Sequence, residues 1–128
     1  MSRHRAYALV ATAAVIAGLV CGFLLLGSPG YQRQVQADTR RVEDLQAIGR
    51  ELHQRHAAAK ALLPATLQEL AITRTDPVTA QPYSYIRADN AKYKLCATFA
   101  LESRPDTGFW HHPAGQHCFA LDASGPVW

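Results

Sequence analysis

The 128-residue sequence lacks the short motifs by which common enzyme classes are recognised. It contains no GxSxG segment to present a serine nucleophile, and no glycine-rich loop that would hold a phosphate. It has no CxxC pair for dithiol chemistry and no CxxCH segment for haem attachment. Isolated carboxylates at Asp89, Asp106 and Asp122 lie near expected turns, where aspartate commonly bonds the local backbone. These absences predict a protein that is not an enzyme, with no cofactor and no small-molecule substrate.

Charged residues are absent from the segment Ala6–Leu26, and none of the 10 acidic residues lies in the first 30 positions. At about 1.5 Å of rise per residue, the 21 residues of this segment would form a helix roughly 31 Å long. That length matches the hydrocarbon thickness of a bilayer. We therefore predict a transmembrane helix in contact with membrane lipid.

Basic residues indicate the orientation of this helix. Arg3 and Arg5 precede it, and the next Lys or Arg is Arg33. Basic residues beside a first apolar segment tend to stay in the cytoplasm. We therefore expect a cytoplasmic N-terminus at a bacterial inner membrane. Residues 1–30 would form the N-terminus, anchor and linker, and residues 31–128 a periplasmic domain.

Two other interpretations of the apolar segment stay open. A cleaved signal peptide has an apolar core of about 7 to 15 residues, shorter than this one, and Ser28-Pro29-Gly30 would be a poor cleavage site. A lipoprotein cysteine at Cys21 would follow Gly18, Leu19 and Val20, which form a poor lipobox. A retained anchor is the preferred interpretation.

Small residues recur at four-residue spacing within the apolar segment, at Ala14, Gly18 and Gly22. They fall on one helix face, where small side chains allow another backbone to approach closely. Membrane helices rich in Ala and Gly also show such spacing by chance. The functional interpretation predicts that this face packs against a transmembrane helix of another protein subunit.

The remaining residues, 31–128, carry 11 basic and 10 acidic side chains. A surface so evenly mixed lacks the clustered Lys and Arg that bind phosphates, so no nucleic-acid partner is expected. About 98 residues are enough for one modest core.

Apolar residues recur at three- and four-residue steps through residues 31–63, which predicts a long amphipathic helix ending before Pro64. The apolar stripe of this helix consists of Val35, Val42, Leu45, Ile48, Leu52, Ala59 and Leu62. Beyond it, Thr66 and Glu69 have the spacing of a capping box and predict a short helical turn that ends near Leu70.

Alternating apolar residues then predict strands at 83–87, 93–99 and 116–121. A hairpin turn is expected at 88–91 and an irregular loop at 102–115. The predicted fold class is α+β, in which the amphipathic helix packs on a small antiparallel sheet of about three strands.

Cys96 and Cys118 both fall in predicted strands of the periplasmic domain, whereas Cys21 lies in the membrane. The periplasm is oxidising, so we predict a Cys96–Cys118 disulfide. Closing a loop of 22 residues would contribute about 3 kcal/mol on the chain-entropy model.

His111, His112 and His117 lie in one short segment and are the candidate metal ligands. Imidazoles can bind zinc or copper, but this spacing matches no defined site, and the nearby thiol is better used in a disulfide. We expect no bound metal.

The predicted long helix is followed by Leu63–Leu70, with the sequence LPATLQEL, and then by Asp76–Tyr85, with the sequence DPVTAQPYSY. This order resembles the pilin and pseudopilin family, especially the major pseudopilins of type II secretion, over roughly residues 35–100. The family is processed at a Gly-Phe junction ahead of its apolar helix, with a Glu five residues into the mature chain. Here Gly22-Phe23 lies at the far end of the apolar segment, and the fifth residue from Phe23 is Gly27. The resemblance thus implies a pilin-like domain on an uncleaved anchor.

Together these features predict a non-catalytic single-pass membrane protein with an extracytoplasmic domain. We expect it to act as an accessory or structural subunit of an inner-membrane complex. The alternative is a pseudopilin-like component of a secretion or pilus-type assembly.

Overall fold

The structure is a computed structural model that describes residues 3–59 and 62–126. Contacts divide the chain into two compact units, one up to Arg33 and one from Gln34 onwards. The predicted boundary between the anchor and the domain lies three residues earlier. Each unit is described separately below.

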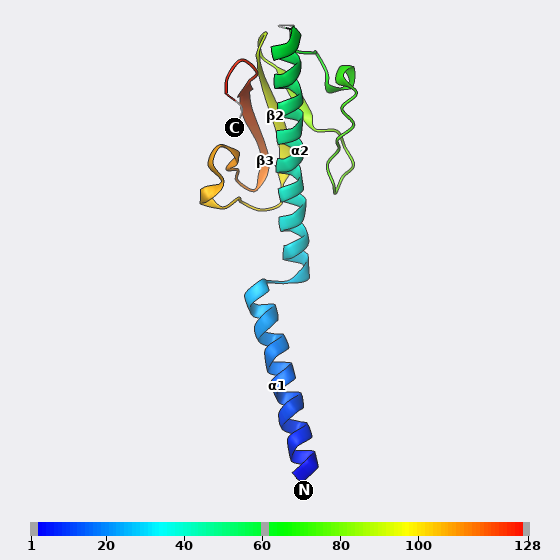
Figure 1. The fold of residues 1–128 in the computed structure, drawn as a ribbon, viewed down its shortest axis with the longest axis vertical. Helices are drawn as coiled ribbons and strands as arrows, with labels where there is room; N and C mark the ends of the chain where they lie inside the picture. Colours follow the sequence, from blue (N-terminus) through cyan, green and yellow to red (C-terminus); the bar gives the residue numbers. More distant parts are fainter. Residues whose placement is uncertain (1–2, 60–61, 127–128) are drawn as a thin grey trace. The chain divides into compact units, whose positions relative to one another are not determined.

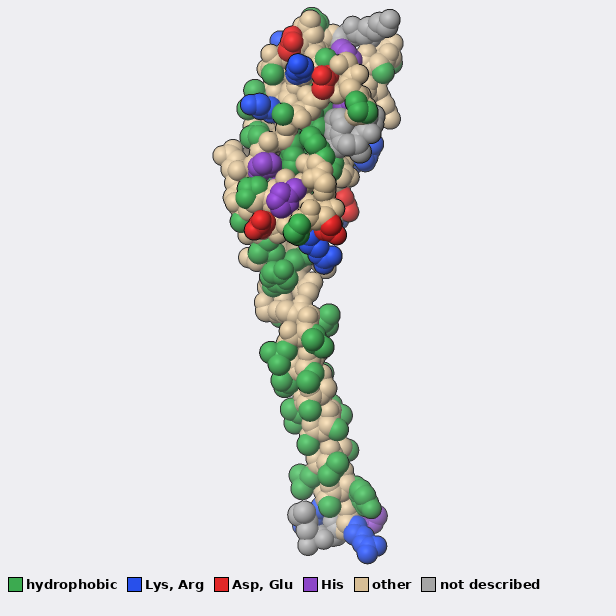
Figure 2. Space-filling model, turned by 90° about the vertical axis from the view of Figure 1, so that its left-hand side faces the viewer, with side chains coloured by type: hydrophobic (Ala, Val, Ile, Leu, Met, Phe, Trp, Pro, Cys, Tyr) green, Lys and Arg blue, Asp and Glu red, His purple; other side chains and the backbone are tan. Residues whose placement is uncertain are grey.

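Helix α1 (Arg3–Leu26) forms most of the first unit and contains no buried residue. Figure 2 shows hydrophobic side chains along its length, with basic residues only at its N-terminal end. By length and composition, it begins the one helical stretch in the described part of the chain that could cross a membrane. The structure therefore has the long apolar N-terminal helix that the sequence predicts.

The helix breaks at Gly27 and Ser28, within the predicted linker. Gly27 adopts a positive φ of 78°, a conformation that glycine reaches without steric cost. Helix α2 (Pro29–Ala59) then begins with a proline, whose missing N–H is not needed in a first turn. The Ser28 hydroxyl accepts a hydrogen bond from the Tyr31 N–H at 3.2 Å and caps this turn.

In the second unit, α2 buries the centre of its predicted apolar stripe at Leu45, Ile48 and Leu52. The stripe does not extend to Ala59 and Leu62, which are exposed. Residues 60–61 lie outside the described part of the chain, and Leu62 is no longer helical. Leu63 is buried instead, because the chain has by then left the helix and turned towards the sheet.

The sheet has three antiparallel strands in the order β1 (Ser84–Arg87), β2 (Lys92–Phe99) and β3 (Gly115–Asp122). Both ends of each strand lie within one residue of the predicted bounds. Figure 1 shows α2 crossing in front of β2. The predicted α+β fold class, a long helix with a small antiparallel sheet, is confirmed.

One face of the sheet carries the core of the domain. Residues at alternate positions of β2 are buried there, and Leu95 faces Phe119 while Tyr93 faces Leu121 across the β2–β3 pair. These side chains form one cluster with the buried residues of α2 and with buried residues from the loops. The cluster consists of Leu45, Ile48, Leu52, Leu63, Leu67, Tyr83, Tyr93, Leu95, Ala97, Phe99, Trp110, Phe119, Leu121 and Ala123.

Two 3₁₀ helices interrupt the loops. The first, η1 (Leu67–Leu70), is the predicted helical turn, but its start differs from the predicted capping box. The Thr66 side chain makes no capping bond, and Glu69 accepts a hydrogen bond at 3.3 Å from the N–H of Ala65, one residue before the cap. The second, η2 (Pro105–Trp110), lies in the loop that the sequence predicts as irregular, and it begins at a proline. It brings Trp110 into the core.

Candidate functional site

The small-residue face of α1 is open in the described structure. Ala14 and Gly18 are exposed, and Gly22 is partly exposed. A Cβ added at Gly18 or Gly22 would meet nothing within 4 Å, so space for another helix backbone exists beside both glycines.

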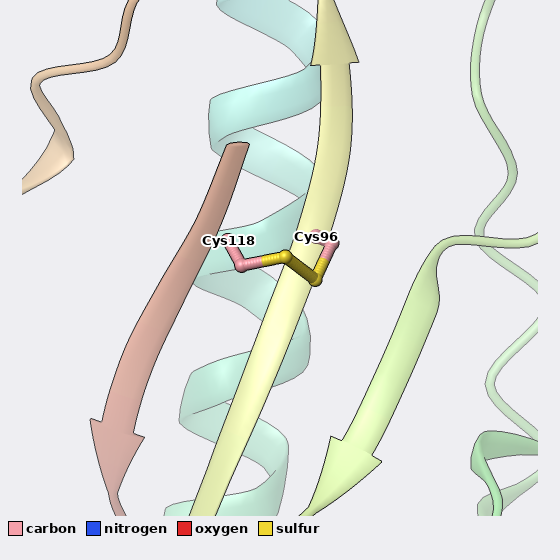
Figure 3. The surroundings of a disulfide bond; sticks show 2 residues. All are labelled: Cys96 and Cys118. Atoms are coloured by element: carbon pink, nitrogen blue, oxygen red, sulfur yellow. A yellow bond between two sulfur atoms is a disulfide. The ribbon is translucent and has the colours of Figure 1, made fainter. Parts of the chain in front are cut away.

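Cys96 and Cys118 are joined by a disulfide between β2 and β3 (Figure 3). They are directly opposite in the strand register, with their Cα atoms 4.0 Å apart. The neighbouring β2 residues Leu95 and Ala97 belong to the core, so the alternation of a strand places the disulfide on the other face of the sheet. Cys21, the third cysteine, is a free thiol on α1.

The outer face of the sheet, the one that carries the disulfide, is largely exposed. Ile86 on β1, Lys94 on β2 and Ala120 on β3 form one exposed row across it. Thr98 and Gln116 form a second exposed pair beyond the disulfide. A sheet with one packed and one solvated face is usual for antiparallel pairing.

The three candidate metal ligands have separate surroundings. His111 is exposed, and its Nδ1 lies 2.8 Å from the Ser103 hydroxyl. His112 is buried and stacks on Phe99 with ring centroids 3.5 Å apart. His117 meets the Phe119 ring edge to face. In the described residues, no group of three His, Cys, Asp or Glu side chains could hold a metal ion.

His112 has a packing role instead. Burial lowers its pKa, because an imidazolium would lose its hydration there, while the Pro113 carbonyl and the charge of Asp38 oppose this shift. The neutral ring is therefore the form that stacks on Phe99. The loop that contains it is held by Ser103, whose hydroxyl accepts a hydrogen bond from the His112 N–H at 2.9 Å.

A buried charged triad, consisting of Asp38, Arg41 and Asp76, fixes two loops to α2. None of the three is among the predicted site residues. The Arg41 guanidinium donates to both oxygens of Asp76, at 2.5 and 3.0 Å, and to Asp38 at 2.7 Å. Asp38 also accepts the N–H groups of Ala100 and Leu101, just after β2, at 2.9 and 2.8 Å. Every member of the triad is buried, so its charges depend on one another.

Asp76 also organises its own loop. Its carboxylate accepts the N–H groups of Val78 and Thr79 at 2.8 and 3.0 Å. The Arg41 hydrogen bonds lower the pKa of Asp76 to about 2 against the opposing effect of burial, and these backbone hydrogen bonds contribute to the lowering. The carboxylate is therefore ionised at neutral pH.

A second polar cluster lies one turn further along α2. Asp44 accepts hydrogen bonds from the Tyr83 hydroxyl at 2.9 Å and from Arg74 at 2.8 Å. Burial and the adjacent Asp44 carboxylate raise the pKa of Tyr83, so its hydroxyl keeps its proton and remains a donor. The charged groups of the two clusters thus bind the Asp76 loop, Arg74 and Tyr83 to α2.

Two adjacent hollows lie beside the C-terminal half of α2. The first, of about 320 Å³, is lined by residues that include Ile48, Glu51 and Arg74. The second, of about 400 Å³, is lined by residues that include Leu52 and Leu62. Leu70 lines both hollows, which together follow the side of the helix that faces the 62–74 segment.

No protein family, curated protein or solved structure that we compared matches this chain.

Proposed function

We propose that this chain is a non-catalytic single-pass membrane protein, anchored in a bacterial inner membrane with its C-terminal domain in the periplasm. In this proposal it serves as an accessory or structural subunit of a membrane complex. The observation that carries the proposal is α1, a 24-residue helix without a buried residue, whose large apolar side chains are exposed throughout. Such a surface is unfavourable in water and favourable in hydrocarbon.

The subunit role is supported by the small-residue face of α1, defined by Ala14, Gly18 and Gly22. Lipid offers no hydrophobic driving force between helices, so close backbone packing is a main source of helix association in membranes. The open space beside Gly18 and Gly22 meets that requirement. The hollows beside α2 give the domain a second surface where a partner could make contact.

The non-catalytic role is supported by how the domain uses its polar groups. Its buried carboxylates at Asp38, Asp44 and Asp76 are all engaged by arginine, tyrosine or backbone N–H donors. A general acid or base needs a pKa near the working pH, whereas the pKa of Asp76 is lowered to about 2. These groups are suited to holding loops in place.

The decisive experiment compares two double variants of the full chain, extracted in mild detergent and analysed by native mass measurement and co-purification. Gly18→Leu with Gly22→Leu fills the proposed packing face. Ala13→Leu with Ala17→Leu adds similar bulk on a different face of α1, and is the matched control. We expect the wild-type and control chains to migrate with the same large complex and the glycine variant to leave it.

Two outcomes would count against this function. A wild-type chain that always migrates as a lone monomer would remove the subunit role. A reporter enzyme that is active only outside the cytoplasm, fused after the domain, should be active if the predicted orientation is correct. An inactive fusion would overturn the periplasmic location.

A pseudopilin-like component of a secretion or pilus-type assembly is the second candidate. It is favoured by one observation, the packing of a long helix against a three-stranded antiparallel sheet. It is opposed by the position of Gly22 and Phe23, which lie in the last turns of α1. This candidate predicts a mature N-terminus at Phe23, and N-terminal sequencing of the membrane-extracted protein would detect it.

A further inference from the structure

The two cysteines of the disulfide differ in their exposure to solvent. Cys118 is an exposed residue on β3, an edge strand of the sheet. Cys96 lies on the central strand between β1 and β3 and is only 3% exposed. The row they share runs from Ser84 on β1 through Cys96 to Cys118. Because Cys118 is the exposed residue of the pair, we expect a reagent from solvent to approach it more readily than Cys96.

The two cysteines would stay side by side without the bond between them. Eight residue pairs join β2 to β3, from Lys92 opposite Asp122 to Phe99 opposite Gly115. On the other face of the sheet, the core holds both strands against α2 through pairs such as Leu95 and Phe119. Breaking the disulfide removes neither the strand pairing nor this packing. Reduced thiols would remain in register and ready to form the bond again.

We propose that the Cys96–Cys118 bond is a thiol–disulfide exchange site in the folded domain, where the dithiol form of a partner protein with two neighbouring thiols reduces the bond and the disulfide form of the same partner re-forms it by the reverse exchange. A thiolate of this dithiol attacks the sulfur of Cys118 and forms a mixed disulfide. The bond to Cys96 breaks, and Cys96 leaves as a thiolate that takes up a proton. The second thiolate of the dithiol then attacks the mixed disulfide and releases Cys118.

The exchange is balanced. The Cys96–Cys118 pair gains two electrons and two protons, and the dithiol is oxidised to a disulfide.

The first experiment reduces the full chain in detergent, without denaturant, with Cys21→Ser in the background so that only two cysteines can react. Dithiothreitol is the probe. Alkylation counts the free thiols, and near-ultraviolet circular dichroism reports the folded domain. We expect both thiols to become free while the spectrum stays folded, and the bond to return when oxidised glutathione replaces the reductant. Reduction that needs denaturant, or that unfolds the domain, would overturn the proposal.

The second experiment tests the direction of attack with two matched variants in the same background. Cys96→Ser leaves Cys118 as the free thiol, and Cys118→Ser leaves Cys96. We expect the Cys118 thiol to react with an aromatic disulfide reagent about tenfold faster or more, because reactivity follows access. Equal rates, or a faster Cys96, would contradict the proposed attack on Cys118.

A third measurement needs no cysteine substitution at either position. Brief alkylation of the reduced chain, followed by peptide mass analysis, shows which thiol is modified first. We expect Cys118 to be modified before Cys96. The reverse order would contradict the proposal even if either serine variant failed to fold.

Discussion

Arg41→Met removes the only cation in the buried triad and leaves Asp38 and Asp76 without it. The guanidinium makes three hydrogen bonds in the triad, at 2.5, 3.0 and 2.7 Å, and its side chain is 7% exposed. Methionine preserves the length of the aliphatic part but supplies no donor. Removing one partner of a buried pair costs about 3 to 5 kcal/mol, because the remaining charges stay buried. We expect a loss of that size in the free energy of unfolding.

The assay is urea unfolding of the full chain in detergent, followed by near-ultraviolet circular dichroism. Arg55→Met is the matched control, because Arg55 also pairs with a carboxylate, that of Glu51 at 2.7 Å, but on the surface. Their side chains are 51% and 41% exposed, and exposed pairs contribute about 0 to 1 kcal/mol. Equal losses in the two variants would refute the reasoning that burial makes the triad important.

The pH dependence gives an independent check on the same triad. The pKa of Asp76 is lowered from 3.8 to about 2 in the folded chain, so the unfolded chain binds more protons between these values. Stability from this group is therefore complete above about pH 5 and is lost as the pH falls towards 2. The shift corresponds to about 2 kcal/mol.

Arg41→Met should abolish this loss at Asp76, since burial without the cation no longer favours the carboxylate. The wild-type chain should accordingly lose about 2 kcal/mol more than the variant between pH 5 and pH 2. Parallel stability curves for the two proteins would show that Arg41 does not hold the ionised form of Asp76.

Three further predictions concern the disulfide, the histidine and the core. Replacing Cys96 and Cys118 by serine should lower the free energy of unfolding by about 3 kcal/mol in urea titrations, because a 22-residue loop is no longer closed. Burial lowers the pKa of His112 below its ordinary value of 6.5, so the unfolded chain takes up a proton at a higher pH than the folded chain. The free energy of unfolding should therefore fall as the pH drops below 6.5. His112→Phe should remove this pH dependence, which thermal melts at several pH values would measure. Leu45→Ala, at a fully buried position, should cost about 2 to 5 kcal/mol, whereas Leu62→Ala, at a 67% exposed position, should cost less than about 0.5 kcal/mol.

The elements of the fold could be predicted because each has a local periodicity. A period of two residues located β2, whose residues from Tyr93 to Phe99 include the four that face the core. Turn residues marked the hairpin before it. The cysteine pair could be predicted because both residues fall in predicted strands of a domain that we expect in an oxidising compartment. These inferences need only the chemistry of neighbouring residues along the chain.

The C-terminal end of the long helix was harder to predict, because the apolar residues that continue the helical spacing are not the ones that are buried. Leu62 continues the helical spacing but is exposed, and Leu63 is buried. The sequence could not reveal that Leu63 is buried in place of Leu62, because this depends on where the chain turns towards the sheet. Arg87 donates to the Leu63 carbonyl at 2.8 Å, an interaction across 24 residues that no local pattern contains.

The spacing of two residues of the charged triad along the sequence indicates that they are buried, although a search for apolar residues alone does not include them. Asp38 and Arg41 continue the three- and four-residue steps of Leu45, Ile48 and Leu52, so they lie on the buried face of α2. Charged residues at core positions of a helix imply buried partners, because an unpaired buried charge is too costly. The spacing thus predicts that partners exist. It cannot say that one of them is Asp76, which is 35 residues away from Arg41.

The contacts that hold the domain together do not involve the disulfide. The triad holds the Asp76 loop and the segment after β2 to α2, and the core holds β2 and β3 to the same helix. Neither set of contacts includes Cys96 or Cys118. Domains of this size have about 5 to 15 kcal/mol of stability, so a bond worth about 3 kcal/mol can be broken without unfolding the rest. A cross-link that the fold does not require is free to open and close in the native state.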